Sequence, residues 1–229
     1  MRRLGALAAA ALCALAGCAH GPEPASGFTL ARGDLLFQDT DCGPLCEAIE
    51  RVTSGVDGAD FTHVGMVSRI EGRTIYVIEA VGAGVIETPL EVFLARSSDA
   101  EGNPKVLVGR LAAEKAELIE AALAEARRHL GKPYDRIYEM RGDAFYCSEL
   151  LYQAFAEANG GEPVFELCPM TFRDPATGET FPPWAAYYAE LGAAIPEGEP
   201  GLNPGGMSRS RYVTIVHAFG RPDGWQGAR

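Results

Sequence analysis

A hairpin pattern in the first half of the chain constrains the fold more than any other feature. Two runs rich in β-branched and aromatic residues, FTHVGMVSRI (61–70) and TIYVIEAV (74–81), are separated by a short segment that contains Gly72. Runs of this kind on either side of a glycine turn are typical of paired antiparallel strands. The sequence therefore predicts a β-hairpin over positions 61–81.

The turn of this hairpin determines which side chains meet across the two strands. Gly72 suits the left-handed position that closes a three-residue turn, and such a turn pairs Arg69 with Arg73. Counting back along both strands then sets His63 opposite Glu79, with their Cβ atoms about 5 Å apart on one face. A two-residue turn would instead place Glu79 on the other face of the sheet.

Strand and helix patterns fall in separate blocks along the rest of the chain. We expect further strands at GDLLFQD (33–39), KVLVGRL (105–111) and RYVTIVHAFG (211–220). We expect helices at CEAIERVTSG (46–55), AAEKAELIEAALAEARRHLG (112–131) and CSELLYQAFAEANGG (147–161). Because the strands do not alternate regularly with helices, an α+β fold is predicted, with an antiparallel sheet packed against helices.

The N-terminus has the pattern of a lipoprotein signal. Arg2 and Arg3 precede an apolar run (4–17) that is too short to remain in a bilayer as a spanning helix. The run leads into LAGC, which matches a lipobox, so we expect cleavage before Cys18 and a lipid on its sulfur. An ordinary signal peptide cut near Ala19 is the alternative.

This signal divides the chain into a signal peptide (1–17), a lipidated cysteine with its tether (18–27) and a single globular domain (28–229). Since more than one acyl chain attaches a protein firmly to a bilayer, we expect an extracytoplasmic protein whose membrane contact is the lipid anchor. Ala19, rather than an acidic residue, follows the lipidated cysteine, which favours the periplasmic face of the outer membrane.

The charge of the chain argues against nucleic acid as a partner. The formal net charge is −11, and loss of positions 1–17 removes two arginines and no acid, which makes it −13. The sequence contains no basic stripe that could follow a phosphate backbone. The acidic surface is an ordinary solution to solubility and leaves the oligomeric state open.

The cysteines of the domain allow structural as well as chemical roles. Cys42 and Cys46 frame a Gly-Pro turn and could form a disulfide in an oxidising compartment, or simply pack. As a zinc site this pair is weak, because no second pair with ligand spacing follows it. A structural role is also expected for Cys168, and neither metal nor cofactor is predicted.

Cys147 stands where a helix pattern begins. A thiol at a helix N-terminus meets the positive end of the helix dipole and unpaired N–H groups, which favour the thiolate and could hold an oxyanion. The alternative is a small apolar side chain buried in the core, which is common for free cysteine.

His63 and Glu79 form the second half of the candidate site. A histidine on a strand is held rigidly, and a carboxylate opposite it could accept a hydrogen bond from the imidazole, fix its tautomer and support its positive form. Glu79 lies within an otherwise apolar run, where carboxylates are rarely buried without a partner. The alternative is a glutamate that faces solvent from the outer side of the sheet.

Five motifs occur in a characteristic order: GDLLFQ, FTHVGMV, YVIEAVGAGVIETPL, GKPYD and FYCSELLYQAF. In this order they resemble the permuted papain-like amidases of the YiiX-like family, relatives of NlpC-type cell-wall cysteine peptidases and of lecithin–retinol acyltransferase. The resemblance covers about 33–155. In ordinary members of the wider group the cysteine precedes the histidine, whereas His63 comes first here, as in the permuted branch.

The resemblance implies a circularly permuted, papain-like (NlpC-like) fold and assigns roles to the candidate residues. It makes Cys147 the nucleophile, His63 the general base and Glu79 the residue that orients the imidazole. Tyr134, in GKPYD, resembles a pocket tyrosine that helps to bind substrate or the oxyanion, and Tyr146 could line the same cleft. Positions 156–229 match nothing confidently, and substrate specificity is expected there.

The resulting expectation is a cysteine-dependent amide hydrolase that needs no cofactor. Its location suggests cell-envelope peptides, such as peptidoglycan stem peptides, as substrates. A lipid acyl hydrolase or acyltransferase is the second hypothesis, and an aliphatic cleft would favour it. A binding lipoprotein without activity is the third, which predicts a Cys147–Cys168 disulfide or a His63 too distant from the sulfur. A metal site made from Cys147, His63 and Glu79 is the least favoured.

Overall fold

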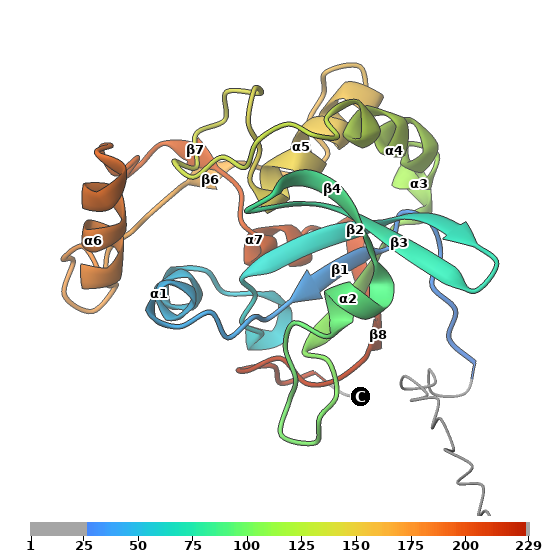
Figure 1. The fold of residues 1–229 in the computed structure, drawn as a ribbon, viewed down its shortest axis with the longest axis horizontal. Coiled ribbons are helices and arrows are strands. Elements are labelled where there is room, and N and C mark those ends of the chain that lie inside the picture. The colour runs from blue at the N-terminus through green and yellow to red at the C-terminus, as the bar shows by residue number, and fades with distance from the viewer. Residues whose placement is uncertain (1–26, 228–229) are drawn as a thin grey trace, which may run out of the picture.

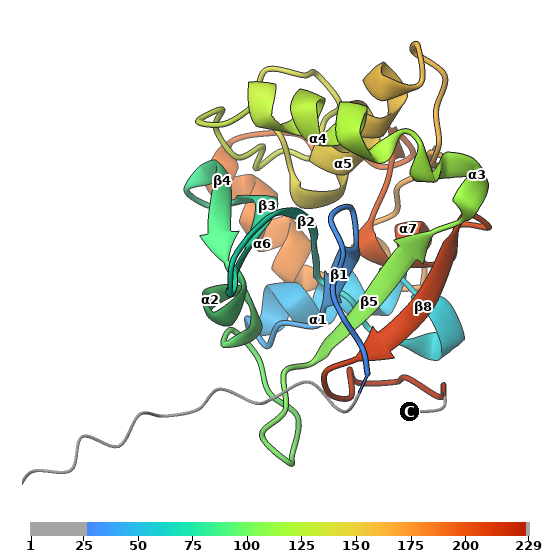
Figure 2. The same cartoon turned by 90° about the vertical axis from the view of Figure 1, so that its right-hand side faces the viewer.

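The centre of the molecule is a six-stranded antiparallel sheet in the order β4-β3-β2-β1-β5-β8 (Figures 1 and 2). The computed structural model describes residues 27–227, so the predicted signal peptide and Cys18 lie outside the described residues. The strands of the sheet are β1 (Leu35–Gln38), β2 (His63–Glu71), β3 (Thr74–Val81), β4 (Gly84–Pro89), β5 (Val106–Leu111) and β8 (Val213–Ala218). A separate two-stranded pair consists of β6 (Cys168–Pro169) and β7 (Pro200–Gly201).

Helices surround this sheet. They are α1 (Pro44–Val52), α2 (Leu90–Leu94), α3 (Ala113–Ala116), α4 (Ile119–Arg128), α5 (Cys147–Ala158), α6 (Pro182–Leu191), α7 (Pro204–Ser208) and a 3₁₀ turn, η1 (Val56–Gly58). Helix α5 contacts β2 and β3, and α4 packs on α5 (Figure 2). No helix in the range 27–227 is both long and apolar enough to cross a bilayer.

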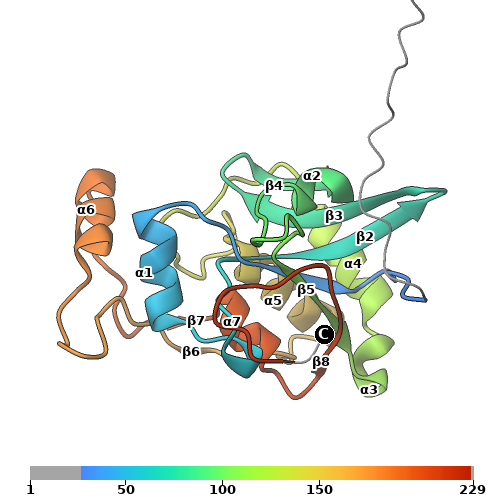
Figure 3. The ribbon, with the colours of Figure 1, turned by 90° about the horizontal axis from the view of Figure 1, so that it is seen from below.

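Alternation along β2 separates two apolar cores. Val64 and Met66 join the larger core, which includes residues of α4 and α5, whereas Val67 joins a second core that contains Phe93 of α2. At one end of the molecule α1 and α6 lie side by side (Figure 3), and Ala48, Trp184 and Tyr188 form a third cluster there. The predicted α+β class, with an antiparallel sheet against helices, is confirmed.

The single long helix predicted over 112–131 is wrong, because the chain forms α3 and α4 instead. Leu118 N donates to the Lys115 carbonyl, three residues back, at the junction between the two helices. A bond of this span tightens the backbone into a 3₁₀-type turn and interrupts the α-helical ladder. The sequence contains neither proline nor glycine at the break, so its helical periodicity carried no sign of it.

The predicted hairpin is present, but its predicted three-residue turn is wrong. Glu71 pairs directly with Thr74, so only Gly72 and Arg73 form the turn. Gly72 has a positive φ of 60°, a conformation that glycine adopts without steric cost. A turn of this length, taken alone, would place Glu79 on the face opposite to the imidazole.

A β-bulge restores the face that the shorter turn would have lost. Between Val67 and Arg69 the register shifts by one residue, which leaves Ser68 without a partner on β3. Beyond the bulge, Met66 pairs with Ile78. Continued to the start of β2, this register sets His63 two positions away from Glu79 on the same face. Their pairing is therefore diagonal rather than direct, and it remains within reach of long side chains.

Candidate active site

Cys147 is the first residue of α5 and is 5% exposed. The helix begins there because Tyr146 has extended backbone angles, φ −92° and ψ 170°, and serves as the N-cap residue. Among the described residues, no protein group accepts a hydrogen bond from the amide of Cys147 or Ser148. The predicted position of the thiol at a helix N-terminus, next to unpaired N–H groups, is confirmed.

His63 lies at the start of β2, and its Nε2 is 2.6 Å from Glu79 Oε2. The side chain of His63 is 12% exposed and that of Glu79 is fully buried. The register places Gly65 across from Glu79, where a Cβ atom would come within 2.5 Å of a Val77 methyl group. Because Gly65 has no side chain, the diagonal path between imidazole and carboxylate stays open.

The imidazole connects this carboxylate to the thiol. Burial lowers the pKa of His63, but hydrogen bonding and charge from Cys147, followed by those from Glu79, outweigh it and raise the pKa to about 9. Since Nε2 faces Glu79, Nδ1 is the nitrogen that remains for Cys147. The structure thus brings together the three residues that the sequence selected, and His63 is protonated at neutral pH when Cys147 is a thiolate.

Two residues that the sequence interpretation missed hold Glu79 in place. Arg96, just after α2, donates from Nη1 to Oε2 and from Nη2 to Oε1, each at 2.6 Å. Thr88 of β4 donates its hydroxyl to Oε1 at 2.5 Å. Burial raises the pKa of Glu79, but the bonds from Arg96, then His63 and Thr88, lower it to about 2. Thr88 pairs with Val77 and shares a face with Glu79, a relation that a hairpin register could have revealed.

The two tyrosines proposed for the cleft both lie beside Cys147, in different roles. Burial, and then the charge of Cys147, raises the pKa of Tyr134, so its hydroxyl stays protonated and can donate. The hydroxyl of Tyr146 accepts a bond of 3.3 Å from Leu202 N. Ser148 donates to the Leu202 carbonyl at 2.7 Å, so the nucleophile helix binds this distant segment at two points.

A cleft with a volume of about 320 Å³ opens at Cys147. Its walls are mostly apolar and aromatic. Many of the lining residues lie after position 155, in the part of the chain where substrate specificity was expected. Arg209 is the one charged side chain among the described lining residues. The principal apolar and aromatic lining residues are Ile49, Val52, Tyr134, Tyr138, Tyr146, Met170, Phe172, Trp184, Leu202 and Pro204.

Tyr138 stands at the centre of the aromatic wall. It has a positive φ of 63°, which is uncommon for a residue with a side chain and tends to occur at functional sites. Its ring lies 5.5 Å from that of Tyr146, 5.9 Å from that of Trp184 and 6.5 Å from that of Tyr134. No sequence pattern indicated Tyr138 or Trp184, because both meet the cleft only through tertiary packing.

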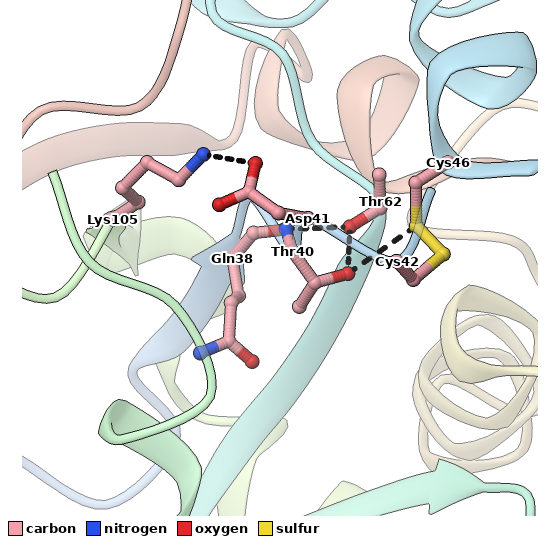
Figure 4. Close-up of a disulfide and its surroundings, with 7 residues drawn as sticks. All are labelled: Gln38, Thr40, Asp41, Cys42, Cys46, Thr62 and Lys105. Atoms are coloured by element: carbon pink, nitrogen blue, oxygen red, sulfur yellow. Dashed lines mark hydrogen bonds and ion pairs between the residues drawn. A yellow bond between two sulfur atoms is a disulfide. The ribbon is translucent and has the colours of Figure 1, made fainter. Parts of the chain in front are cut away.

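Cys42 and Cys46 form a disulfide, which decides between the two structural roles left open for them. The Thr40 hydroxyl lies 3.5 Å from Cys46 Sγ and 2.6 Å from the Thr62 hydroxyl (Figure 4). Thr62 lines the cleft and directly precedes His63. The disulfide therefore braces the strand end that carries the imidazole.

Three further residues near the site are a free thiol, for which the described part of the chain shows no structural role, and two carboxyl groups that bind backbone amides. Cys168 is a free, exposed thiol on the cleft wall and forms no disulfide with Cys147. Glu149 is buried, accepts from Tyr146 N at 3.3 Å, and burial raises its pKa to about 8. Asp135 accepts from two backbone amides in its own turn.

An acidic cluster outside the cleft resembles a metal site only in composition. Oxygens of Asp39, Asp41 and Asp223 lie within 4.8 Å of one another. The Lys105 ammonium lies 3.1, 2.7 and 3.2 Å from these three carboxylates, and Figure 4 shows its contact with Asp41. Lys105 thus takes the place that a cation would need. At the cleft, Arg96 and Thr88 already use the Glu79 oxygens, so that set does not fit a metal either.

Comparison with known proteins then identifies the family. A family model described as "Permuted papain-like amidase enzyme, YaeF/YiiX, C92 family" matches residues 29–217. The chain belongs to this family. Membership confirms the permuted papain-like fold that the ordered motifs suggested, and it supports activity of the amidase or peptidase type.

Two relatives illustrate the similarity. "Uncharacterized protein YiiX" of Escherichia coli (strain K12) is 31% identical over 137 residues, which are 60% of this chain and 63% of that protein. The match thus spans less than two thirds of that relative's length. A crystal structure described as metalloprotein yiiX from Escherichia coli O157:H7 has a TM-score of 0.62 and 27% identity, and covers 82% of this chain and 96% of that one.

Proposed function

We propose that this protein is a cysteine-dependent amide hydrolase in which Cys147, His63 and Glu79 act as one unit. The observation that carries the proposal is the continuous line from the thiol at the N-terminus of α5, through the imidazole, to a buried and ionised carboxylate. Each member is placed by a different element, and a nucleophile, a base and a group that orients the base in this order are the geometry expected of an acyl-transfer site.

The first half-reaction follows from this order. The Cys147 thiolate attacks the amide carbonyl carbon, and the carbonyl oxygen gains the negative charge. The proton on His63 Nδ1 passes to the departing nitrogen as the C–N bond breaks, which leaves a thioester on Cys147 and a free amine. Glu79 accepts from Nε2 throughout and stabilises the protonated ring.

The second half-reaction returns the site to its starting state. Neutral His63 takes a proton from water, the resulting hydroxide attacks the thioester, and the C–S bond breaks to release a carboxylic acid and the thiolate. In both halves the amides of Cys147 and Ser148 face the developing oxyanion at the helix N-terminus. The protonated Tyr134 hydroxyl is the side chain best suited to add a third donor.

The cleft supports an apolar acyl or side-chain group in the substrate. Aromatic and aliphatic walls favour burial of such a group by about 25 cal/mol for each Å² removed from water. The same observation favours a second candidate, a lipid acyl hydrolase or acyltransferase that forms the same thioester. A lipid anchor at Cys18 and a cell-envelope peptide substrate remain part of the proposal, and they rest on the N-terminal sequence pattern.

Metal dependence is not part of the proposal. One relative is described as a metalloprotein. In this chain Lys105 neutralises the acidic cluster, and the carboxylate of the cleft is fully engaged by protein donors. The roles assigned to Cys147 and His63 are carried by protein groups alone.

The decisive experiment is alkylation of Cys147 by iodoacetamide as a function of pH. It uses the full chain with Cys13, Cys18 and Cys168 replaced by serine, so that Cys147 is the only free thiol. We expect rapid labelling at neutral pH, because a thiol at a helix N-terminus beside an imidazole is reactive, and loss of this reactivity in His63→Ala. Slow labelling, or equal labelling in both proteins, would contradict the proposal.

Substrate class is tested next with the same protein. Stem-peptide amides, N-acyl amides and acyl esters of increasing chain length are compared, with Cys147→Ser as the inactive control. A preference for amides supports the proposed amide hydrolase. Turnover confined to long-chain esters supports the second candidate, a lipid acyl hydrolase or acyltransferase.

A further inference from the structure

The Glu79 carboxylate makes more contacts than the orientation of an imidazole requires. His63 uses one of its oxygens, and Arg96 grips both with a two-pronged guanidinium contact. Thr88 then takes the remaining position on Oε1. Because the carboxylate is fully buried, it has no access to water that could replace any of these donors.

Arg96 also lies close to the imidazole itself. Arg96 Nη1 and His63 Nε2 each bind Glu79 Oε2 at 2.6 Å, so these two nitrogens are at most about 5 Å apart. A like charge at about 4–6 Å disfavours the protonated form of a histidine. The positive charge of Arg96 therefore opposes the proton-attracting effect of Glu79 on His63.

The segment that carries Arg96 is fixed against the same site. The ring of Phe93 lies near both Arg96 and His63. Its centre is 5.2 Å from the guanidinium carbon of Arg96 and 5.7 Å from the ring centre of His63. Gln38 of β1 is fully buried and pairs with His63 of β2. Its side-chain amide donates to the Phe93 carbonyl at 2.8 Å. The turn after α2 is thus tied to the strand next to the imidazole.

We propose that Arg96 is a positioning residue of the site, which locks the Glu79 carboxylate toward His63 and limits how tightly the imidazole holds its proton. The inference rests on the proposed function, because it concerns the same three groups. The charged groups that face His63 are Glu79 from β3, Cys147 from α5 and Arg96 from the turn after α2. Thr88 from β4 adds a neutral donor.

The consequence for catalysis is a balance of two needs. An ionised Glu79 favours the thiolate–imidazolium pair, but an imidazole that holds its proton too tightly donates it slowly to the leaving amine. Arg96 keeps the carboxylate ionised and at the same time reduces its net field at His63. No other described residue contacts both oxygens of Glu79.

The test compares Arg96→Gln and Arg96→Lys with the native full chain. The pKa of His63 is followed by NMR of the ring Cε1–H signal. The chain has four histidines, and the His63 signal is assigned by its loss in His63→Gln. We expect Arg96→Gln to raise the pKa of His63 by about one unit and to lower the rate of amide turnover at least tenfold. Arg96→Lys should keep the pKa within a few tenths of a unit, while the turnover still falls because one prong of the contact is lost.

Arg110→Gln is the matched control. Arg110 also binds both oxygens of a buried carboxylate, Asp34, through Nε and Nη2 at 2.7 Å each, away from the cleft. Its loss is expected to lower stability without moving the pKa of His63. If Arg96→Gln leaves that pKa unchanged, or if Arg96→Lys shifts it as much as Arg96→Gln does, Arg96 has only a structural role and the inference fails.

The titration also separates this inference from the proposed function. If no amide or ester is turned over, the proposed function fails, yet the shift of the His63 signal still tests the effect of Arg96. If Arg96→Gln does not fold, Arg96→Lys decides: a raised pKa in that charge-retaining variant contradicts the inference, and an unchanged pKa with slower turnover supports it.

Discussion

Ionisation of Glu79 should make the free energy of unfolding depend on pH at acidic pH, and a Glu79→Gln variant can isolate this contribution. Its pKa is lowered from 4.5 to about 2, against burial, mainly by Arg96 and His63. A carboxyl group whose pKa falls on folding stabilises the folded state above the pKa of the unfolded chain. That stabilisation is lost as the pH falls through the pKa of the folded state. The window is therefore about pH 4.5 to pH 2.

The magnitude follows from the size of the shift. One pKa unit corresponds to about 1.4 kcal/mol, so a shift from 4.5 to about 2 is worth about 3 kcal/mol for a fully buried group. Most of this amount should disappear between pH 6 and pH 2.

The assay is urea denaturation at several pH values, on a Cys147→Ser background that removes the thiol from the titration. The free energy of unfolding is compared between that protein and the same protein with Glu79→Gln. The difference between the two should shrink by about 3 kcal/mol from pH 6 to pH 2, because the Glu79 carboxylate gains a proton over this range and the glutamine side chain does not. A difference that stays constant with pH would mean that Glu79 is not ionised in the folded state, and the proposed role of the carboxylate would fail.

Two further predictions concern the cleft and its support. Met170→Ala enlarges the apolar wall, and we expect kcat/KM for a long-chain acyl substrate to fall about tenfold relative to an acetyl substrate; an equal loss for both would exclude Met170 from specificity. Replacement of Cys42 and Cys46 by serine opens a short loop, and the free energy of unfolding should fall by about 2 kcal/mol, measured by thermal or urea denaturation. No change in stability would mean that the disulfide does not form in solution.

Much of the site could be predicted because its residues carry local signals. Cys147 begins a helix whose amphipathic pattern is evident, and a glutamate within an apolar run indicates a buried partner. The same local patterns did not predict the strand register correctly. The diagonal pairing of His63 and Glu79 depends on two features, a two-residue turn and a bulge at Ser68, that cancel in their effect on the face.

The residues that were missed act across large distances in the chain. Arg96 reaches Glu79 from a turn that only tertiary packing brings near it, and nothing in its neighbours marks it as different from the other arginines. Trp184 and Leu202 reach the cleft because the last third of the chain returns to the N-terminus of α5. Contacts of this kind have no periodicity, so a single sequence cannot display them.

The sequence by itself indicated the α+β class, five of the six strands of the central sheet, and the thiol, imidazole and carboxylate of the candidate site. It could do so because side-chain period, turn residues and buried charge are properties of short segments. Only the tertiary structure decided how His63 meets Glu79, that Arg96 and Thr88 hold the carboxylate, and that the cleft is apolar. Those features depend on register and on packing between distant segments, where a shift of one residue moves a side chain to the other face.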